Sequence, residues 1–545
     1  MAKRKTGSAT APRRGRKKSD AAAPGPANRA LDMPMLESWL WDAACAIRGA
    51  MDAPKFKDYI LPLIFIKRLS DVYEDELAAL AGKGLGDVAT AAEMAAGDHG
   101  LVRFYIPPAA TWPELRRLTR DIGQKLTDTV RSIADENESL QGVIDIVDFN
   151  ATVSGERIIA DEKLSALIEV ISRHRIGLCD AEPDLLGRAY EYLLRKFAEG
   201  QGQSAGEFYT PREVGLILAH ILNPAPGQTA YDPACGSAGL LIKLQLVCKE
   251  NHDTAAAEQP LRLFGQEQSP VTYAMAKMNM AIHDMIGDDV YNVAIGDTLR
   301  NPKFLNGSGL KTFDLVVANP MWNQKGYDVK FYDEDPFGRF KLGYPTGNTA
   351  DWGWVQHMVA SLADGGRAGV VLDTGAVSRG SGSKSSDKER DTRAAFVDRD
   401  LVEGVVLLPE NLFYNTTAPG VLLFLNRAKR GKRRGRIMLI NASGEFAKGK
   451  PKNFIPEAGI RRIADTFLKL KEVEKFSRVI TNDEAKANDY NLSPSRYIAL
   501  GDAANHRPIA EILDDFDESR DEAARIDKAL NAVFTKLGLR MIGGK

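Results

Sequence analysis

The segment Phe313–Gln324, "FDLVVANPMWNQ", places a polar turn directly after an apolar run. The run reads as a buried strand that ends at Asn319 and Pro320. The Asn side-chain oxygen and the carbonyl that follows it can accept both N–H groups of an exocyclic amine, which returns lone-pair density to the nitrogen. Pro320 stiffens the turn, and Trp322 offers a face for a flipped-out base. The turn therefore predicts a site for a nucleobase amino group, although Asn-Pro after a strand is also a common turn signal.

A second motif, "YDPACGSAGLLIKL", predicts a ligand-binding loop. A strand ends at Asp232 and an apolar helix follows, so a ligand between them lies against backbone and a helix N-terminus. The spacing is not GxGxxG and includes no P-loop lysine, so a grip on phosphate is not expected. A plain strand-to-helix turn is the alternative. The small residues of the loop are Ala234, Gly236, Ser237, Ala238 and Gly239.

Acidic residues end two further predicted strands. Glu267 follows "LRLFGQ" and is placed to bind two ribose hydroxyls, and Asp297 in "GDTL" is placed to accept from an adenine amino group. Each acid alone also suits a helix cap. Together with the loop they predict a nucleoside ligand with a short charged tail, for which S-adenosylmethionine is the candidate. Its methyl group would pass in line to the amine nitrogen, with positioning supplying most of the rate.

The segment "GEFYTPREV", Gly206–Val214, precedes these strands. Thr210 as N-cap, Pro211 at the first helical position and Glu213 at the third fit a capping box. The capping box does not explain Phe208 and Tyr209, two aromatic residues that could pack on an adenosine.

The elements that must position these residues follow from apolar periodicity. Between residues 229 and 427, short apolar runs alternate with helical segments, which predicts a mostly parallel sheet covered on both faces, with ligands at the carboxyl ends of its strands. The polar segment 378–393 has the composition of a mobile loop, either a surface insertion or a segment that orders over nucleic acid. Residues 508–539 carry a coiled-coil-like apolar seam that favours a partner helix.

Four regions are therefore expected. Residues 1–30 form a disordered basic tail, which either brushes phosphates or is merely solvated. Residues 31–170 form a helical domain, 171–475 the α/β domain, and 476–545 a C-terminal helical extension for partner contact.

Composition restricts the function classes. The net charge of −1 means that binding to an acidic polymer must use local basic patches or a partner. The longest apolar stretch, 59–66, contains Pro62 and is too short to span a membrane. Scattered cysteines fit a reducing cytoplasm with free thiols and no metal site. They are Cys45, Cys179, Cys235 and Cys248.

The motifs "GEFYTPREV", "DPACGSAGLL", "GQE" and "ANPMWNQ", in this order, resemble those of N6-adenine DNA methyltransferases, specifically the modification subunit of type I restriction-modification systems. The segments 40–71, 184–198 and 489–498 resemble that subunit's helical domain, linking helix and C-terminal segment. The resemblance implies a Rossmann-like methyltransferase sheet with an N-terminal all-helical domain and a C-terminal helical, coiled-coil-like extension. It also implies methyl transfer from S-adenosylmethionine to a flipped-out adenine in double-stranded DNA.

The resemblance also implies roles for individual residues. Asp232 and Gly236 would shape the cofactor loop, and Asn319, Pro320, Met321 and Trp322 would hold the adenine. The family's usual Asn-Pro-Pro-Phe or Asn-Pro-Pro-Tyr reads Asn-Pro-Met-Trp here, so a stacking ring is kept while Met321 loosens the turn. Residues that would contact the cofactor are Glu207, Phe208, Tyr209, Thr210, Pro211, Arg212, Ser237, Ala238, Gly239 and Glu267.

The family's catalytic subunit does not read DNA sequence. The resemblance implies a specificity subunit, a second copy of the modification subunit, and a restriction/translocase subunit as a further partner. Three alternatives stay open: a catalytically silent assembly subunit that binds S-adenosylmethionine, the methylase of a related phage-defence system, and a protein glutamine methyltransferase.

Overall fold

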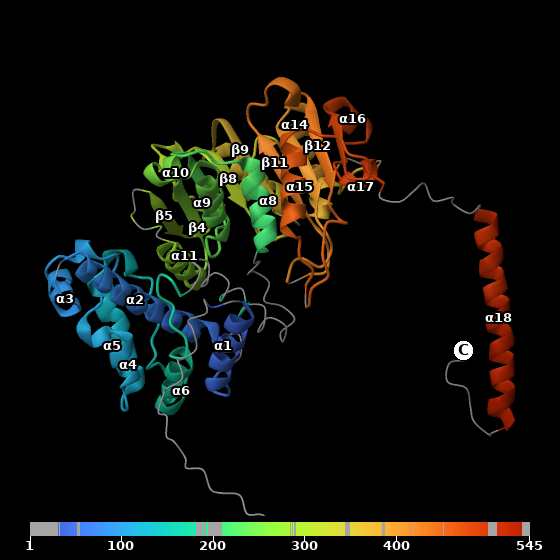
Figure 1. Ribbon diagram of the computed structural model, residues 1–545. Coiled ribbons are helices and arrows are strands. Elements are labelled where there is room, and N and C mark those ends of the chain that lie inside the picture. Colours follow the sequence, from blue (N-terminus) through green and yellow to red (C-terminus); the bar gives the residue numbers. More distant parts are fainter. Residues whose placement is uncertain are drawn as a thin grey trace, which may run out of the picture. The chain divides into compact units, whose positions relative to one another are not determined.

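The computed structural model describes residues 31, 33–51, 55–84, 86–180, 189, 192–193, 210–283, 285, 287, 290–343, 349–383, 387–414, 416–450, 452–499 and 509–536. The basic tail 1–30 and three predicted cofactor residues, Glu207, Phe208 and Tyr209, lie outside these ranges. The chain divides into two compact units (Figure 1). One comprises residues 1–204 and 274–287, and the other comprises 205–273 and 288–545.

The first unit is helical, as predicted. Its apolar residues recur at helical spacing, and Leu36 and Leu40 of α1 are completely buried in one continuous core. The indole N–H of Trp39 donates to the carbonyl of Val170 at 2.8 Å and ties α1 to the end of α6. Its α-helices are α1 (Met33–Ala46), α2 (Lys57–Gly82), α3 (Val88–Gly97), α4 (Trp112–Arg116), α5 (Ile122–Asp135) and α6 (Asp161–Ile171), beside a small hairpin of β1 (Thr152–Val153) and β2 (Glu156–Arg157).

The second unit is built on a sheet that has nine strands within the described ranges. In spatial order they are β13, β12, β10, β11, β9, β8, β3, β4 and β5. The five strands from β9 to β5 are parallel, β10 is also parallel to β12, and β11 and β13 run antiparallel to their neighbours. The bounds are β3 (Thr229–Asp232), β4 (Arg262–Glu267), β5 (Tyr291–Ile295), β8 (Phe313–Ala318), β9 (Leu362–Asp373), β10 (Val402–Leu407), β11 (Gly420–Asn426), β12 (Arg436–Asn441) and β13 (Ser477–Thr481), with a separate hairpin of β6 (Leu305–Asn306) and β7 (Gly309–Leu310).

Helices cover both faces of this sheet (Figure 1). Leu423 and Leu425 of β11 join the core that contains Trp352 of α13, whereas Phe424 between them packs on Phe467 of α15. This alternation is the period of a strand buried on both sides. The α-helices around the sheet are α8 (Arg212–Leu222), α9 (Gly239–His252), α10 (Thr254–Glu258), α12 (Val329–Asp333), α13 (Asp351–Ala360), α14 (Lys388–Asp398), α15 (Glu457–Leu468), α16 (Asn482–Ala487) and α17 (Pro494–Tyr497); α11 (Pro270–Ile282) also follows a sheet strand, and most of it groups with the first unit.

The strand order reverses between β3 and β8. The chain runs from β3 outward through β4 and β5, and then returns to place β8 on the other side of β3. In an open α/β sheet, ligands bind at the carboxyl ends of the strands that flank such a reversal. The predicted site residues Asp232 and Asn319 stand at these two strand ends.

Segment 378–393 differs from the predicted mobile loop. Helix α14 begins at Lys388, and the Arg393 side chain within it is completely buried. Its guanidinium donates to the carbonyls of Tyr490 at 2.6 Å and Arg379 at 2.9 Å. In the part of this segment that the structure describes, Glu389 and Arg393 are buried, whereas Ser383, Lys388 and Asp391 are exposed.

The α/β unit also extends further along the chain than predicted. Strand β13 pairs with β12 beyond the expected boundary at residue 475, so residues 476–499 complete the sheet unit rather than begin a helical extension. The final helix, α18 (Ile509–Lys536), spans 28 residues and exposes Phe516, Ile526, Leu530 and Val533. Within the described residues, the helices are all too short or too polar to cross a membrane.

Candidate active site

Asn319 stands directly after β8 and is anchored through both ends of its side-chain amide. Its Nδ2 donates to the hydroxyl of Thr210 at 3.0 Å, and its Oδ1 accepts the indole N–H of Trp322 at 3.2 Å. An indole nitrogen can only donate, so the amide atom that faces Trp322 must be the oxygen. Because a carbonyl oxygen has two lone pairs, Oδ1 can accept a second hydrogen bond. The Asn319 side chain is 8% exposed.

The contact of Thr210 corrects the predicted capping box. The N-cap of α8 is Pro211, and no side-chain hydrogen bond caps this helix. The Thr210 hydroxyl instead accepts a hydrogen bond from Asn319, which lies 109 residues away in the sequence. Glu213, the expected reciprocal cap, lies in a buried environment that raises its pKa. A local capping pattern cannot reveal such a long-range partner.

Trp322 packs against residues that the sequence motifs did not include. Its ring meets the ring of buried Phe413 edge to face, with centroids 4.9 Å apart. A Cβ on Gly420, the first residue of β11, would lie 3.1 Å from the Trp322 ring. Pro320 is buried and Met321 is half-buried. The only feature of the sequence that singles out Phe413 is that it is an aromatic residue shortly after the buried strand β10.

The loop after β3 has the backbone expected of a ligand cradle. Gly236 has φ +54° and Ala238 has φ +62°, and α9 begins at Gly239. Among the described residues, a Cβ on Gly236 would meet no atom within 4 Å, so these residues leave the backbone there accessible to a ligand. Ser237 lies between these two left-handed positions, and Gly239 begins α9. Residues 236–239 of the predicted loop therefore lie at the N-terminus of α9.

Asp232 forms a hydrogen bond with the backbone of this loop. Its carboxylate is almost completely buried and accepts the N–H of Ala234 at 3.0 Å. Burial, together with the nearby Glu267, raises the pKa of Asp232 to about 8. The role of Asp232 in shaping the loop stays a prediction.

Glu267 joins the end of β4 to the same loop. One carboxylate oxygen accepts the N–H of Gly236 at 3.0 Å, and the other accepts the N–H of Ser269 at 2.9 Å. The side chain is half-buried. The ribose contact expected of Glu267 stays a prediction.

Asp297, after β5, mainly stabilises its own turn. Its carboxylate accepts the N–H groups of Leu299 at 3.0 Å and Arg300 at 3.2 Å, and it lies 3.4 Å from the Tyr327 hydroxyl. The hydroxyl of Thr298 donates to the carbonyl of Pro233 at 2.6 Å and joins this turn to the β3 loop. The expected adenine contact of Asp297 stays a prediction, and Arg212 is exposed at the first turn of α8.

Comparisons with known proteins identify the family. The N-6 DNA Methylase family matches residues 181–505, more than half of the chain, and the HsdM N-terminal domain matches residues 36–171. The MjaVIII methylase subunit of a type I restriction enzyme from Methanocaldococcus jannaschii is 38% identical over 394 residues, which cover 66% of this chain and 65% of the relative. The MjaVII methylase subunit from the same organism is 31% identical and covers 87% of this chain and 80% of the relative.

A solved structure shares the fold. The crystal structure of the methyltransferase subunit of a type I restriction-modification system from Streptococcus thermophilus matches with a TM-score of 0.71 at 27% identity, over 85% of this chain and 99% of that one. The chain therefore belongs to the N-6 DNA methylase family, as an adenine-specific DNA methyltransferase of the type I modification-subunit kind that uses S-adenosylmethionine as methyl donor.

Proposed function

We propose that Asn319 and the Pro320 carbonyl hold the amino group of a flipped-out adenine in double-stranded DNA, beside a methyl donor bound at the Gly236 loop. The observation that carries the proposal is the anchoring of Asn319. Its amide is fixed by Thr210 and Trp322 at the end of β8, next to the strand that leads into the loop.

The chemistry requires the nitrogen lone pair to be available. Two acceptors on the amino hydrogens polarise the N–H bonds so that more electron density stays on the nitrogen, and a lone pair of Asn319 Oδ1 supplies one of these acceptors. The indole N–H of Trp322 can only donate and therefore keeps Oδ1 in place, so the amide does not turn to offer its NH₂ in place of an acceptor, while the Thr210 hydroxyl accepts from Nδ2. S-adenosylmethionine supplies a methyl group on a positively charged sulfur. Gly236, Ser237 and Glu267 would hold that cofactor.

Substitution of Asn319 tests the proposal. Asn319→Ala should lower the rate of labelled methyl transfer to DNA by about 10²-fold or more, the effect of removing one preorganised hydrogen-bonding group. Binding of S-adenosylmethionine, measured by calorimetry, should stay unchanged. Asn306→Ala, at an exposed position in β6, serves as the control. Undiminished transfer by Asn319→Ala would exclude the proposed role.

A second candidate, which the family assignment disfavours, is a silent assembly subunit. It draws support from Trp322, whose indole N–H already occupies one lone pair of Asn319 Oδ1. Cofactor binding without any adenine methylation in the complete complex would establish it, whereas methylation by the native complex would exclude it. A methylase of a related phage-defence system would carry out the same chemistry with different partners.

We also propose that this chain depends on partners in the cytoplasm. A specificity subunit would select the DNA site, a second copy of this chain would share the complex, and a restriction subunit could join. The net charge of −1 and the exposed apolar residues of α18 support this dependence on partners. Methyl transfer by the chain alone should be much slower than transfer with its recognition partner.

A further inference from the structure

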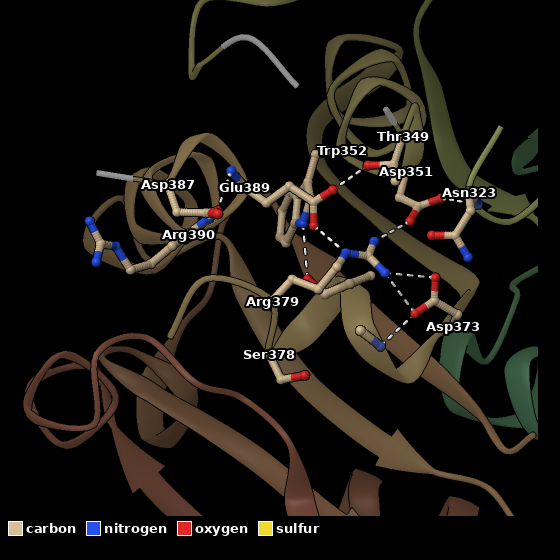
Figure 2. A network of polar contacts seen from close by, with 12 residues as sticks. Asn323, Thr349, Asp351, Trp352, Asp373, Ser378, Arg379, Asp387, Glu389 and Arg390 are labelled. Atoms are coloured by element: carbon tan, nitrogen blue, oxygen red, sulfur yellow. Dashed lines mark hydrogen bonds and ion pairs between the residues drawn. The ribbon is translucent and has the colours of Figure 1, made fainter. Parts of the chain in front are cut away.

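The guanidinium of Arg379 lies among three acidic side chains from three different elements (Figure 2). Its Nε donates to Glu389 of α14 at 2.6 Å, and its Nη1 donates to both oxygens of Asp373 at the end of β9, each at 2.9 Å. Its Nη2 donates to Asp351 at the start of α13. This arrangement uses all three nitrogens of the guanidinium.

Two of these acids are buried beside Arg379. The side chains of Asp351 and Glu389 are 0% and 4% exposed. A buried carboxylate without a cationic partner is strongly unfavourable. Even beside Arg379, burial and the neighbouring Asp373 raise the pKa of Asp351 to about 6. Removal of Arg379 would leave Asp351 without its cation.

Asp351 in turn holds the end of the proposed base-binding turn. Its second oxygen accepts the backbone N–H of Asn323 at 3.0 Å. Asn323 directly follows Trp322 and has φ +55°, a left-handed conformation that asparagine adopts more readily than most residues other than glycine. A second contact comes from the same helix, because Trp354 Nε1 donates to Gln324 Oε1 at 2.9 Å.

We propose that Arg379 is a positioning residue for methyl transfer, because it holds Asp351, which fixes Asn323 and thereby the orientation of the turn from Asn319 to Trp322. This proposal rests on the proposed function of that turn. Thr210 anchors the beginning of the turn and α13 anchors its end, so loss of Arg379 should free the end while Asn319 keeps its contact with Thr210. Lysine offers a compact point charge and cannot bridge all three acids.

The test compares Arg379→Ala, Arg379→Lys and Arg390→Ala in the full chain with its recognition partner. Arg390 is the matched control, because it lies in the same segment but its contacts run to Asp391, Asp489 and the carbonyl of Ser383. Rates are divided by the number of S-adenosylmethionine sites counted by calorimetry, so that unfolded protein does not contribute. Hydrogen exchange of the peptide 319–324 provides a readout that does not require activity.

We expect Arg379→Ala to lower kcat by about tenfold to 100-fold, the effect of a misplacement near 1 Å, with the cofactor Kd changed less than twofold. Arg379→Lys should recover only part of the rate, and the peptide 319–324 should exchange faster in both variants than in Arg390→Ala. Equal kcat and equal exchange in Arg379→Ala and Arg390→Ala would overturn the proposal. If the native complex transfers no methyl group, the proposed function fails, and the exchange of peptide 319–324 alone decides the role of Arg379.

Discussion

Thr210 illustrates how one hydroxyl can serve the active site in place of its own helix. Thr210→Val keeps the shape of the side chain but removes the acceptor for Asn319 Nδ2. Because a single hydrogen bond contributes about 1 kcal/mol, we expect kcat to fall by roughly fivefold to tenfold, with cofactor binding unchanged. Thr210→Ser should keep most of the rate. Equal rates for Thr210→Val and Thr210→Ser would show that the hydroxyl does not hold the amide during the reaction.

Asp232 gives a prediction about stability and pH. Its folded pKa of about 8 lies above the usual value of about 3.9 for an unfolded Asp. Between these values the folded chain keeps a proton that the unfolded chain has lost, so the free energy of unfolding falls as pH rises toward 8. Asp232→Asn should remove about 1.4 kcal/mol per pH unit from this fall.

Denaturant unfolding between pH 6.5 and 8 measures the effect of Asp232→Asn. This window lies above the pKa of about 6 of Asp351, so the second buried acid adds little there. Asp364→Asn, at an exposed carboxylate, is the control. Parallel pH curves for the native protein and Asp232→Asn would mean that Asp232 is ionised in the folded state.

At the scale of elements, the apolar runs predicted the strands and their carboxyl-end site, because a strand buried on both faces must be apolar throughout. The expected capping box and the expected mobile loop were wrong because polar side chains there have distant partners. Thr210 matched a local cap but binds Asn319, and Arg393 looked solvated but donates to the carbonyl of Tyr490. Phe413 was missed because nothing in its local sequence shows that it meets Trp322. Such pairings depend on topology, which a single sequence does not specify.

Gly404 in β10 provides a test of sheet packing. A Cβ there would lie 2.5 Å from the carbonyl oxygen of Met438 in the adjacent strand and 2.5 Å from the ring of Phe467. Since backbone of a central strand cannot give way easily, Gly404→Ala should lower the free energy of unfolding by about 3 kcal/mol. Gly444→Ala, where a Cβ meets no atom within 4 Å, should change it by less than about 0.5 kcal/mol. A neutral Gly404→Ala would show that β10 and β12 can separate.

At the scale of the whole molecule, α18 offers an apolar stripe for assembly. Phe516, Ile526, Leu530 and Val533 lie along one side of the helix by its 3.6-residue period, and each is at least 43% exposed. Exposed apolar stripes of this kind mark sites of helix association. We therefore expect this helix to contact the specificity subunit or the second copy of the chain.

The triple substitution of Phe516, Ile526 and Leu530 by Ser tests this expectation. It should leave calorimetric binding of S-adenosylmethionine unchanged, because the proposed cofactor residues lie in the sheet unit, and it should reduce the complex seen by sedimentation with the recognition partner by at least tenfold. Methyl transfer to DNA should fall in parallel and recover at high partner concentration, since the chemistry of each site is intact. Asp521→Ser with Lys528→Ser alters the opposite side of α18 and should assemble normally. Normal assembly of the triple variant would place the partner contact elsewhere in the molecule.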